Sequence, residues 1–577
     1  MTKIFHLLIV LIFIANNCHA LNLSDLWVGE AASKRRDLTA VEANNFMISS
    51  AHPLASKAGK EMMAKNGNVI DAIIAAQMVL NVVEPQSSGI GGGGFLLYYD
   101  AKNKNYKYYN GREIAPEMAH EKMFLDDNGN PENFLEALQG GKAVAVPGLL
   151  KLLKAVHDDY GKLPWKTLFQ PAINLARDGY AVDHRLYVNI KKAKYLKNFY
   201  ETKNLYLDKN GNPYKIGTII KNEKLAQTLE KIANQGIKIF YNGELAQKIV
   251  DKVNNSHINP GFLKLSDLKN YQIKEGKPIC AKYRKKYKIC SMSLPSSGGV
   301  TILQILGILE NFDLNNYSPN SISSIHLISE ATRIAYEDRN KYIGDKADIP
   351  IKQMIDKKYL KKRSLLINTK KAAKSYSPGL LNKVNLVDNS KIEPSETTHI
   401  SAIDKERNAI SFTSSIEYFF GSALSVEGFL LNNHMTDFSF IDKIDNKKVA
   451  NAVGPFKQPR SSMSPTFIFD NNNNLIMILG SPGGPRIIQY VVKTIIASLD
   501  WGMDMQEAIS LPNFTVLNNV IELEKETNIT KYAKKLRKMG HKVKIKDQVS
   551  GIHAIRVSND IIIGGADPRR SGVVLGN

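Results

Sequence analysis

Two adjacent threonines, Thr397 and Thr398, begin an alternating polar and apolar run in the second half of the chain. A hydroxyl is a weak nucleophile unless a base lies beside it, and an N-terminal threonine supplies that base through its own α-amine. Cleavage between Glu396 and Thr397 would therefore create a nucleophile and its base in one residue. On the pair alone, the ordinary interpretation is two β-branched residues at the start of a strand.

The elements that would position the threonines follow from hydrophobic periodicity. Residues 398–403 and 408–414 alternate as two strands around the polar turn 404–408. The polar segment 370–396 before them has the composition of a flexible linker, which a self-cleaving precursor needs next to its cleavage point.

The first half of the chain is rich in predicted helices. Asn68–Val83 has the length and apolar content of a buried helix, and Glu84-Pro85 ends it. The glycine run 89–94 precedes a predicted strand at 95–99, whereas a phosphate loop follows a strand and opens a helix, so we interpret the run as close backbone packing. Further helices are predicted at 149–158, 165–178, 221–234, 243–253, 300–311, 322–341, 486–499 and 505–510, and further strands at 427–432, 466–469, 475–479, 552–557 and 560–564.

The composition indicates a globular protein with a large core. Hydrophobic residues make up 43% of the 577 residues. Residues 1–20 combine one lysine, a short apolar run and a small final residue, which is typical of a cleaved secretory signal and too short for a membrane span. An uncleaved anchor is the alternative, and lipid attachment at Cys18 is disfavoured because bulky Asn17 precedes it. No stable membrane span is expected after signal removal.

The formal net charge of +22 does not indicate nucleic-acid binding. Basic residues are dispersed through Lys/Asn/Ile-rich segments such as 191–223 and 356–373, without arginine clusters or a nucleic-acid fold signature. We interpret them as a solvated surface, with loose attraction to an anionic surface as the alternative. The 12 histidines are scattered without metal-ligand spacing, so we expect no metal and no cofactor.

Cys280 and Cys290 are the two cysteines that remain after signal removal. They flank residues 283–287 symmetrically, in the manner of a hairpin. In an oxidising compartment a cross-strand disulfide fits this arrangement, and two free, half-buried thiols fit it equally.

Several segments beyond the threonines match one enzyme family in order and in approximate spacing. A single tetrapeptide would mean little, but so many in register make chance negligible. They are 67–97 (GNVIDAIIAAQMVLNVVEPQSSGIGGGGFLL), 110–116 (NGREIAP), 145–148 (AVPG), 160–165 (YGKLPW), 294–299 (LPSSGG), 430–439 (LLNNHMTDFS), 460–466 (RSSMSPT), 480–484 (GSPGG) and 565–570 (GADPRR). With the threonine pair, the chain resembles the γ-glutamyltranspeptidases (glutathione hydrolases).

The resemblance implies an α+β fold of the N-terminal-nucleophile hydrolase type. This is a four-layer αββα sandwich of two packed sheets between helices, formed jointly by two chains cut from one precursor. Cleavage before Thr397 would give a large subunit, 21–396, and a small subunit, 397–577. We expect the two subunits to stay associated, because both contribute to one core.

The resemblance also implies the catalytic residues. Thr397 Oγ, activated by its freed α-amine, would attack the γ-carbonyl of a γ-glutamyl amide. Ser415 stands where the family usually has a threonine, and it keeps the hydroxyl that contacts the nucleophile. Gly483 and Gly484 would donate backbone N–H groups to the oxyanion, each worth ~3 kcal/mol of barrier. Water, or an amino acid or peptide amine, would then resolve the ester.

Substrate selection needs a cation for the α-carboxylate and an anion for the α-amine. The resemblance assigns these roles to Arg112, which can hold a carboxylate through two hydrogen bonds, and to Asp437. Ser461 and Ser462 fit the positions that add hydroxyl donors to the same carboxylate.

Departures from the family pattern concern the same pocket. Glu417 replaces a usual asparagine and would add negative charge if it faced the α-ammonium, and His434 replaces a usual glutamine or glutamate. The segment between Asp437 and Ser461 is shorter than in relatives with a full lid, and a lid tyrosine is not evident. The local sequences at 414–417 and 436–440 also resemble those of relatives classed as cephalosporin or glutaryl acylases.

The sequence therefore predicts a periplasmic or secreted enzyme. It would hydrolyse glutathione or other γ-glutamyl compounds and transfer the γ-glutamyl group to amino acid or peptide acceptors, without nucleic-acid partners. The second interpretation is an acylase of the same superfamily, and the third is a weakly active exported binding protein. Arg112 with Asp437 favours the first over the second, because a substrate without an amino-acid end would leave both charges unpaired. The intact Thr397, Ser415 and Gly483-Gly484 argue against the third.

Overall fold

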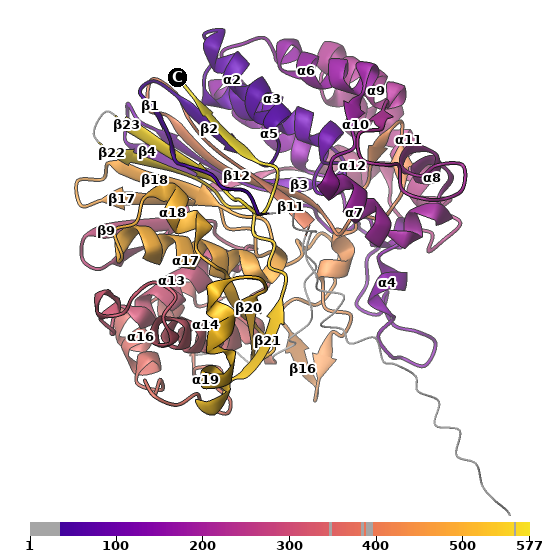
Figure 1. Cartoon of the computed structure of the whole chain (residues 1–577). Helices are drawn as coiled ribbons and strands as arrows, with labels where there is room; N and C mark the ends of the chain where they lie inside the picture. The colour runs from indigo at the N-terminus through magenta and orange to yellow at the C-terminus, as the bar shows by residue number, and fades with distance from the viewer. Residues whose placement is uncertain (1–34, 346–348, 382–385, 388–395, 559–560) are drawn as a thin grey trace, which may run out of the picture.

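The computed structural model describes residues 35–345, 349–381, 386–387, 396–558 and 561–577 (Figure 1). The signal-peptide prediction for 1–20 lies outside these residues, as does part of the linker prediction. The described part of the linker is anchored, so the prediction of flexibility is wrong there: Ala372 N–H donates to Met539 O (2.7 Å) and Gly379 N–H to Asp338 Oδ1 (2.7 Å). Within the described residues, none of the helices has the length and apolarity needed to cross a membrane.

Two antiparallel sheets of seven strands each form the centre of the molecule. The first has the order β24 (Val573–Gly576), β2 (Met47–Ser50), β11 (Glu396–Ile403), β12 (Ala409–Glu417), β3 (Gly93–Asp100), β4 (Asn105–Gly111) and β7 (Lys274–Gly276). The second has the order β1 (Val41–Ala43), β23 (Ile561–Ala566), β22 (His553–Ser558), β18 (Leu475–Gly480), β17 (Thr466–Asp470), β9 (Tyr287–Ser291) and β8 (Ile279–Tyr283).

The sheets lie against each other and helices cover their outer faces (Figure 1). Ser411 Oγ of β12 donates to Leu479 O of β18, and Ser401 Oγ of β11 donates to His553 O of β22, both at 2.8 Å. These hydroxyls join the sheets without leaving buried polar groups unpaired. The covering helices are α2 (Pro53–Ala64), α3 (Val69–Val83) and α5 (Leu149–Tyr160) on the first sheet, and α13 (Gly298–Leu309) and α17 (Ile487–Leu499) on the second.

Helix α3 shows why the apolar signature segment is helical. Asn68 caps it by accepting from the backbone of Ile70 and Asp71, and the Asp71 side chain accepts from Asn68 N–H in return (2.9 Å). Every residue of the helix is buried, because it lies between the first sheet and α2 and α6. A helix that is apolar on all sides needs such a position.

The remaining α-helices and strands lie outside the two central sheets and the helices that cover them. The other α-helices are α4 (Phe134–Ala137), α6 (Trp165–Asp178), α7 (His184–Lys192), α8 (Tyr200–Tyr206), α9 (Glu223–Gln235), α10 (Lys238–Asn242), α11 (Glu244–Asn254), α12 (Leu265–Asn270), α14 (Ile322–Tyr342), α15 (Ile351–Met354), α16 (Lys357–Ser364), α18 (Met505–Ser510) and α19 (Ala533–Lys538). The other strands are β5 (Tyr180–Ala181), β6 (Ile219–Ile220), β10 (Leu386–Val387), β13 (Ser425–Val426), β14 (Phe429–Leu430), β15 (Lys443–Ile444), β16 (Lys447–Val449), β19 (Phe514–Leu517), β20 (Val520–Glu524) and β21 (Lys542–Lys546).

The helices predicted from periodicity are all present, with ends that move by a few residues. The strand predicted at 427–432 is wrong in extent. Only Phe429–Leu430 is extended there, because Gly428, with φ 89°, turns the chain into a short hairpin with β13. Strands β2, β4 and β24 were not predicted, because their short or tyrosine- and lysine-rich stretches lack a clear apolar alternation.

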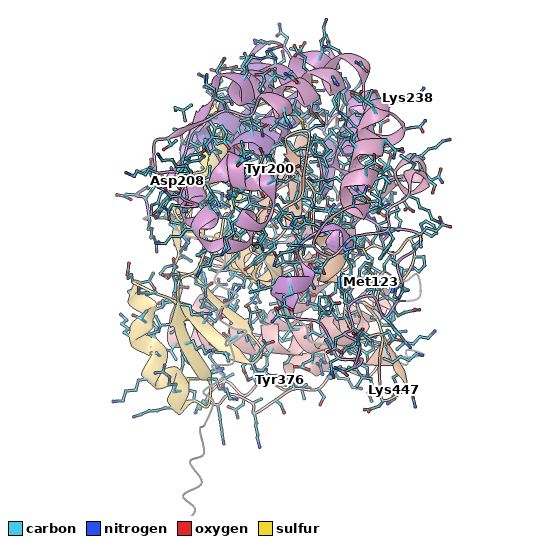
Figure 2. All side chains as sticks on the ribbon, turned by 90° about the vertical axis from the view of Figure 1, so that its right-hand side faces the viewer. Met123, Tyr200, Asp208, Lys238, Tyr376 and Lys447 are labelled. Carbon is cyan, nitrogen blue, oxygen red and sulfur yellow. A yellow bond between two sulfur atoms is a disulfide. The ribbon has the colours of Figure 1, made fainter. Side chains whose placement is uncertain are left out.

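Basic side chains are spread over the surface. Figure 2 shows Lys238 and Lys447 projecting into solvent far apart on one face. Several lysines have carboxylate partners in exposed ion pairs, such as Lys248 with Glu427 at 2.9 Å. Such pairs contribute little to stability, and the exclusion of nucleic acid stays a prediction.

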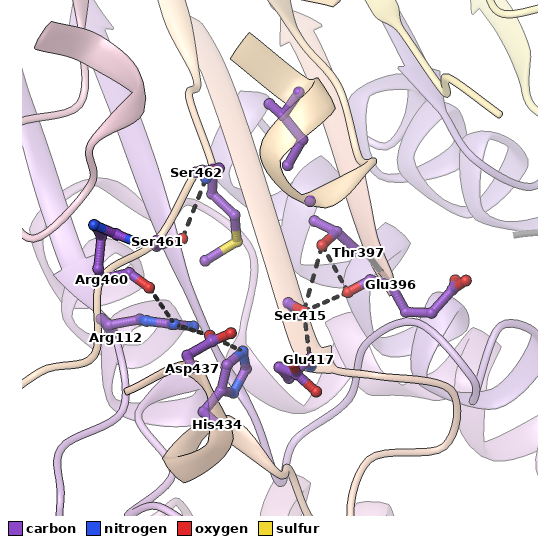
Figure 3. Close-up of a pocket in the computed structure, with 13 residues that line it drawn as sticks. Arg112, Glu396, Thr397, Ser415, Glu417, His434, Asp437, Arg460, Ser461 and Ser462 are labelled. Carbon is purple, nitrogen blue, oxygen red and sulfur yellow. Dashed lines mark hydrogen bonds and ion pairs between the residues drawn. The ribbon is translucent and has the colours of Figure 1, made fainter. Parts of the chain in front are cut away.

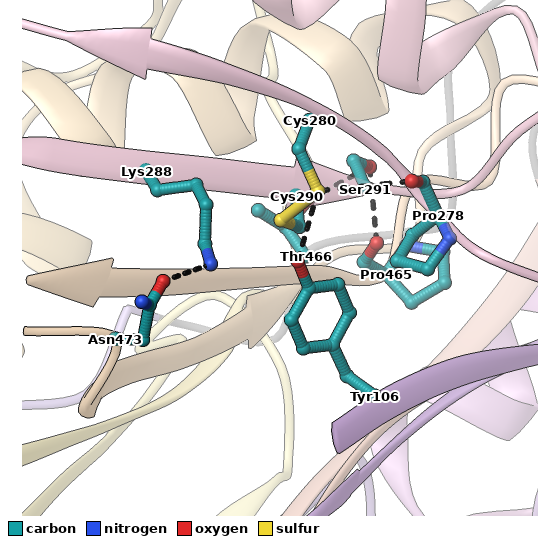
Figure 4. The surroundings of a disulfide bond; sticks show 9 residues. All are labelled: Tyr106, Pro278, Cys280, Lys288, Cys290, Ser291, Pro465, Thr466 and Asn473. Atoms are coloured by element: carbon teal, nitrogen blue, oxygen red, sulfur yellow. Dashed lines mark hydrogen bonds between the residues drawn. A yellow bond between two sulfur atoms is a disulfide. The ribbon is translucent and has the colours of Figure 1, made fainter. Parts of the chain in front are cut away.

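Cys280 and Cys290 form a disulfide across the hairpin of β8 and β9 (Figure 4). The two residues are directly paired in the strand register. Cys290 is fully buried, and Cys280 is partly buried near the Tyr106 hydroxyl. The structure thus selects the disulfide from the two alternatives that the sequence allowed.

Removing this disulfide should lower stability without abolishing the fold. A cross-link that closes a loop of this length stabilises a protein by about 2–3 kcal/mol. We expect the double variant Cys280→Ala/Cys290→Ala to melt a few degrees lower. A reductant should lower the Tm of the wild type and leave that of the variant unchanged. Equal reductant sensitivity in both proteins would contradict the assignment.

Candidate functional site

The predicted nucleophile and its hydroxyl neighbour meet at one carbonyl oxygen. In the uncut chain, Thr397 Oγ donates to Glu396 O at 2.6 Å, and Ser415 Oγ donates to the same oxygen at 2.5 Å (Figure 3). The two hydroxyl oxygens are 3.4 Å apart. Thr397 and Ser415 are both buried. The carbonyl that a self-cleaving threonine would attack is therefore held between two hydroxyl groups.

The strand pairing explains how Thr397 departs from regular geometry. Glu396 pairs with Glu417 and Thr398 with Ser414, so the register of β11 and β12 shifts at Thr397. Glu417 has φ 84°, a left-handed conformation that is strained for a residue with a side chain. Its N–H donates to Ser415 Oγ (2.8 Å), which leaves the Ser415 proton for the Glu396 carbonyl.

The glycine run packs directly behind this site. A Cβ on Gly92 would lie 2.2 Å from the carbonyl oxygen of Ser415, so only glycine allows β3 to approach. The prediction of close backbone packing is confirmed.

A pocket opens beside Thr397 and collects nearly all the predicted site residues (Figure 3). It is lined by Arg112, Glu396, Thr397, Ser415, Glu417, His434, Asp437, Arg460, Ser461, Ser462, Met463, Gly484 and Ile487. Its polar lining contains both signs of charge, as a pocket for an amino-acid end requires.

Arg112, just after β4, is the central cation of the pocket and is buried. Its guanidinium forms an ion pair with Asp437 and a second with Glu113 at 3.3 Å. It also donates to the carbonyl oxygens of Pro459 and Arg460, each at 3.3 Å. The sequence placed Arg112 and Asp437 in separate roles, and the structure brings them into direct contact.

His434 lies in the short 3-10 helix His434–Asp437, between two carboxylates. Its Nδ1 is 2.9 Å from Glu113 Oε1, and its Nε2 is 4.0 Å from Asp437 Oδ2. The imidazole therefore lies between the carboxylate that pairs with Arg112 and the carboxylate predicted to receive the α-amine.

The Glu417 carboxyl lies in a buried environment that the sequence did not indicate. Burial, followed by the charge of Asp437, raises the pKa of the Glu417 carboxyl well above its ordinary value, against the opposing effects of Asn433 and Arg112. Its Oε2 accepts from the Asn433 side chain. Burial and the Asp437 charge therefore disfavour the ionised form of the Glu417 carboxyl, and the extra negative charge in the pocket stays a prediction.

Ser461 and Ser462 both line the pocket and are held by different partners. Ser462 Oγ accepts from Arg339 Nη2 (2.8 Å), so a cation on α14 orients this hydroxyl. Ser461 Oγ accepts from Met463 N–H (3.2 Å). In both cases a donor from the protein orients the hydroxyl.

Of the two glycines predicted as oxyanion donors, Gly484 lines the pocket and Gly483 does not. Gly484 lines the pocket and begins the 3-10 turn Gly484–Arg486 that leads into α17. Gly483 precedes it with φ 129°, and it is not among the pocket-lining residues of the described chain. Both glycines thus lie in the turn that leads into α17, and their role as oxyanion donors stays a prediction.

Several residues of this site were not predicted from the sequence. Glu113 follows Arg112 directly and could have been found as a buried partner for it. Arg339 gave no signal, because it lies in the ordinary helical pattern of α14. The other missed residues are Asn433, Arg460, Met463 and Ile487.

A second cluster, outside the pocket, corrects the view that the histidines are scattered. His326, Glu330 and His541 come together in the interior. However, His326 Nδ1 lies 2.7 Å from His541 Nε2, a hydrogen-bond distance. Glu330 accepts from Arg333, Tyr376 and the Ala373 N–H. These groups satisfy each other, so the donor set does not fit a metal ion.

Comparisons with known proteins agree with this geometry. The family profile described as gamma-glutamyltranspeptidase matches residues 55–577. The chain is 35% identical to the glutathione hydrolase proenzyme of Bacillus subtilis, over 92% of this chain and 91% of that protein. It is 36% identical to the Escherichia coli glutathione hydrolase proenzyme with the same two coverages. The crystal structure of cephalosporin acylase from Bacillus halodurans superposes with a TM-score of 0.81 at 25% identity, covering 94% of this chain and 98% of that one.

The fold and the site define a mixed α/β hydrolase that shares its architecture with acylases and transpeptidases. The chain belongs to the γ-glutamyltranspeptidase family. The recognition made from the sequence motifs is confirmed, and with it the assignment of the chain as an enzyme.

The Ser415 hydroxyl should be needed for self-cleavage. It donates to the carbonyl oxygen that would become an oxyanion, and loss of one such donor slows a reaction on the order of 100-fold. We expect Ser415→Ala to accumulate uncut chain in a pulse-labelled time course, while Ser415→Thr is cut normally. Ser414→Ala is the matched control, because that hydroxyl donates to Gln77 instead. Normal cutting of Ser415→Ala would rule out this role.

Proposed function

We propose that this chain is the precursor of an exported γ-glutamyltransferase and glutathione hydrolase. The contact of Arg112 with Asp437, beside the Thr397 hydroxyl, is the observation that carries the proposal. An amino-acid end, with one carboxylate and one ammonium group, can enter this pair and replace one ion pair by two. The two glutathione hydrolase relatives, both proenzymes, support the same conclusion.

Processing would start from the geometry of the uncut chain. Thr397 Oγ attacks the Glu396 carbonyl carbon, the C–N bond breaks, and the acyl group moves from nitrogen to oxygen. Water then hydrolyses the ester and leaves a carboxylate on Glu396 and a free amine on Thr397. The products are the large subunit 21–396 and the small subunit 397–577, which together form the processed N-terminal-nucleophile sandwich.

The mature cycle would reuse the same atoms on a γ-glutamyl amide. The Thr397 amine takes the proton of its own Oγ, which attacks the γ-carbonyl. The N–H groups of Gly483 and Gly484 stabilise the oxyanion. The leaving amine departs with a proton, and water or an acceptor amine then attacks the γ-glutamyl ester.

The substrate's α-amino acid end would lie in the charged pocket. Arg112 and the hydroxyls of Ser461 and Ser462 receive the α-carboxylate. Asp437 receives the α-ammonium, with Glu417 and His434 completing that side of the pocket. The signal peptide predicted at 1–20 would direct the protein to the periplasm or the medium.

An acylase of the same superfamily is the second candidate. Glu417 at the position of a usual asparagine favours it, together with the likeness to the Bacillus halodurans cephalosporin acylase. The two candidates share the nucleophile and differ in the acyl group they accept.

Substitution of the nucleophile tests the proposal as a whole. Thr397→Ala should remain one uncut chain without γ-glutamyl anilide hydrolysis, as judged by gel and by aniline release. Thr398→Val is the matched control, because Thr398 is buried and its Oγ1 has no hydrogen-bond partner among the described residues. A wild type that stays uncut yet active, or a cut Thr397→Ala, would overturn the mechanism.

A substrate pair separates the two candidate functions. Glutaryl anilide lacks the α-ammonium and would leave Asp437 without its partner. We expect kcat/KM for γ-glutamyl anilide to exceed that for glutaryl anilide by about 100-fold, ~2.7 kcal/mol, with the gap lost in Asp437→Asn. Asp442→Asn, a partly exposed carboxylate of the same segment, should keep the gap. Equal kcat/KM values in the wild type would select the acylase.

A further inference from the structure

Arg570 is a buried arginine that contacts the main chain of the nucleophile. Its Nη1 donates to the carbonyl oxygen of Thr397 at 3.3 Å, and the residue is 0% exposed. The same guanidinium donates to Ser550 O at 3.2 Å and to Val549 O at 3.4 Å. Three main-chain acceptors therefore hold a positive charge against the residue that the proposed cleavage would turn into an N-terminus.

The connection from β23 to β24 places Arg570 at this point. Strand β23 belongs to one central sheet and β24 to the other, so residues 567–572 cross between the sheets. Gly551 leaves room for the arginine, because a Cβ at that position would lie 2.6 Å from Arg570 Nε and 2.6 Å from Pro482 Cγ. The arginine, the start of β11 and the turn at Pro482 are therefore close neighbours.

The charge of Arg570 lies near the atom that would act as the base. The carbonyl oxygen and the nitrogen of one residue are three bonds apart, so Arg570 Nη1 lies within about 7 Å of Thr397 N. Burial lowers the pKa of the Arg570 side chain, but a guanidinium keeps its proton at neutral pH. A cation at this distance disfavours a second positive charge, because like charges repel strongly where water is excluded.

An N-terminal threonine needs such an effect. Its α-amine can accept the proton of Oγ only while the amine is itself unprotonated. An ordinary α-amine has a pKa of about 7.7–8.0, so most of it is protonated at pH 7. We propose that Arg570 positions Thr397 in the mature enzyme and keeps its freed α-amine unprotonated at neutral pH. This proposal rests on the proposed function and explains how the base of that mechanism becomes available.

Other ionisable groups also lie near Thr397 and Arg570. Arg112 is paired with Asp437 in the pocket. Arg185 of α7 is paired with Glu84. In both pairs a carboxylate offsets the charge of the arginine, whereas Arg570 donates to the three carbonyl oxygens. Burial lowers the pKa of two neighbouring imidazoles, so they are neutral at pH 7. These are His399 and His553, and the remaining groups are Glu396, Glu417, His434, Arg460, Lys192 and the ion pair of Arg569 with Asp567.

The test is the pH profile of kcat/KM for γ-glutamyl anilide, measured on the processed enzyme. Its acidic limb reports the pKa of the base in the free enzyme. We expect Arg570→Gln to move this limb to higher pH by about one unit, because loss of the cation lets the amine hold its proton more tightly. Below the limb kcat/KM should fall about tenfold, and above it much less. Arg570→Lys, which keeps the charge, should keep the wild-type limb.

A control variant separates this effect from a general loss of stability. Arg556→Gln removes a partly buried arginine of β22 that donates to Ser498, and it should keep the wild-type limb. If Arg570→Gln lowers kcat/KM by the same factor at every pH, so that the limb stays in place, the arginine has only a structural role and the proposal is overturned.

A direct measurement covers the case in which Arg570→Gln does not fold or is not cut. Cyanate reacts only with an unprotonated amine, so the pH dependence of its reaction with the N-terminus of the wild-type small subunit gives the pKa of the Thr397 amine. We expect a pKa about one unit below that of an ordinary α-amine. A pKa that is not lowered overturns the proposal. Failure of the wild type to hydrolyse γ-glutamyl anilide at any pH would instead overturn the proposed function.

Discussion

One carbonyl oxygen, that of Glu396, organises the site. Two hydroxyls, from Thr397 and Ser415, donate to it from adjacent strands at the centre of a sheet. The geometry needs a register shift in β11, the Glu417 N–H behind Ser415, and a glycine at position 92 to let β3 approach. Together these features hold the Glu396 carbonyl within hydrogen-bonding distance of the Thr397 hydroxyl.

Buried charges lie on two sides of Thr397. Arg112 and Asp437 meet on one side, supported by Glu113 and His434. Arg185 and Glu84 meet on the other side. Buried ion pairs of this kind add little net stability, because desolvation offsets their attraction. Their charged groups are held in fixed positions. A polar substrate can therefore replace its hydrating water by partners that are already oriented.

The sequence predicted most of the residues that line the pocket at Thr397, and it predicted the long helices. Sequence motifs identified Arg112, Asp437, Ser461 and Ser462 as pocket residues. Long apolar stretches predicted the helices α3 and α13. It could not supply contacts between residues far apart in the chain, such as Arg339 with Ser462 or His326 with His541. Nor could it show that burial beside Asp437 would raise the pKa of the Glu417 carboxyl, because that depends on packing and not on residue type.

The strand order of the first sheet has a consequence for the life of the enzyme. Strands from before position 397 (β2, β3, β4 and β7) alternate in blocks with strands from after it (β24, β11 and β12). Folding of the intact chain is a unimolecular search, but a cut chain that unfolds would have to find its other half by diffusion. Recovery from heat or denaturant would then depend on concentration and compete with aggregation. Each molecule would thus fold once as a single chain, and its working lifetime would be set by the rate of unfolding.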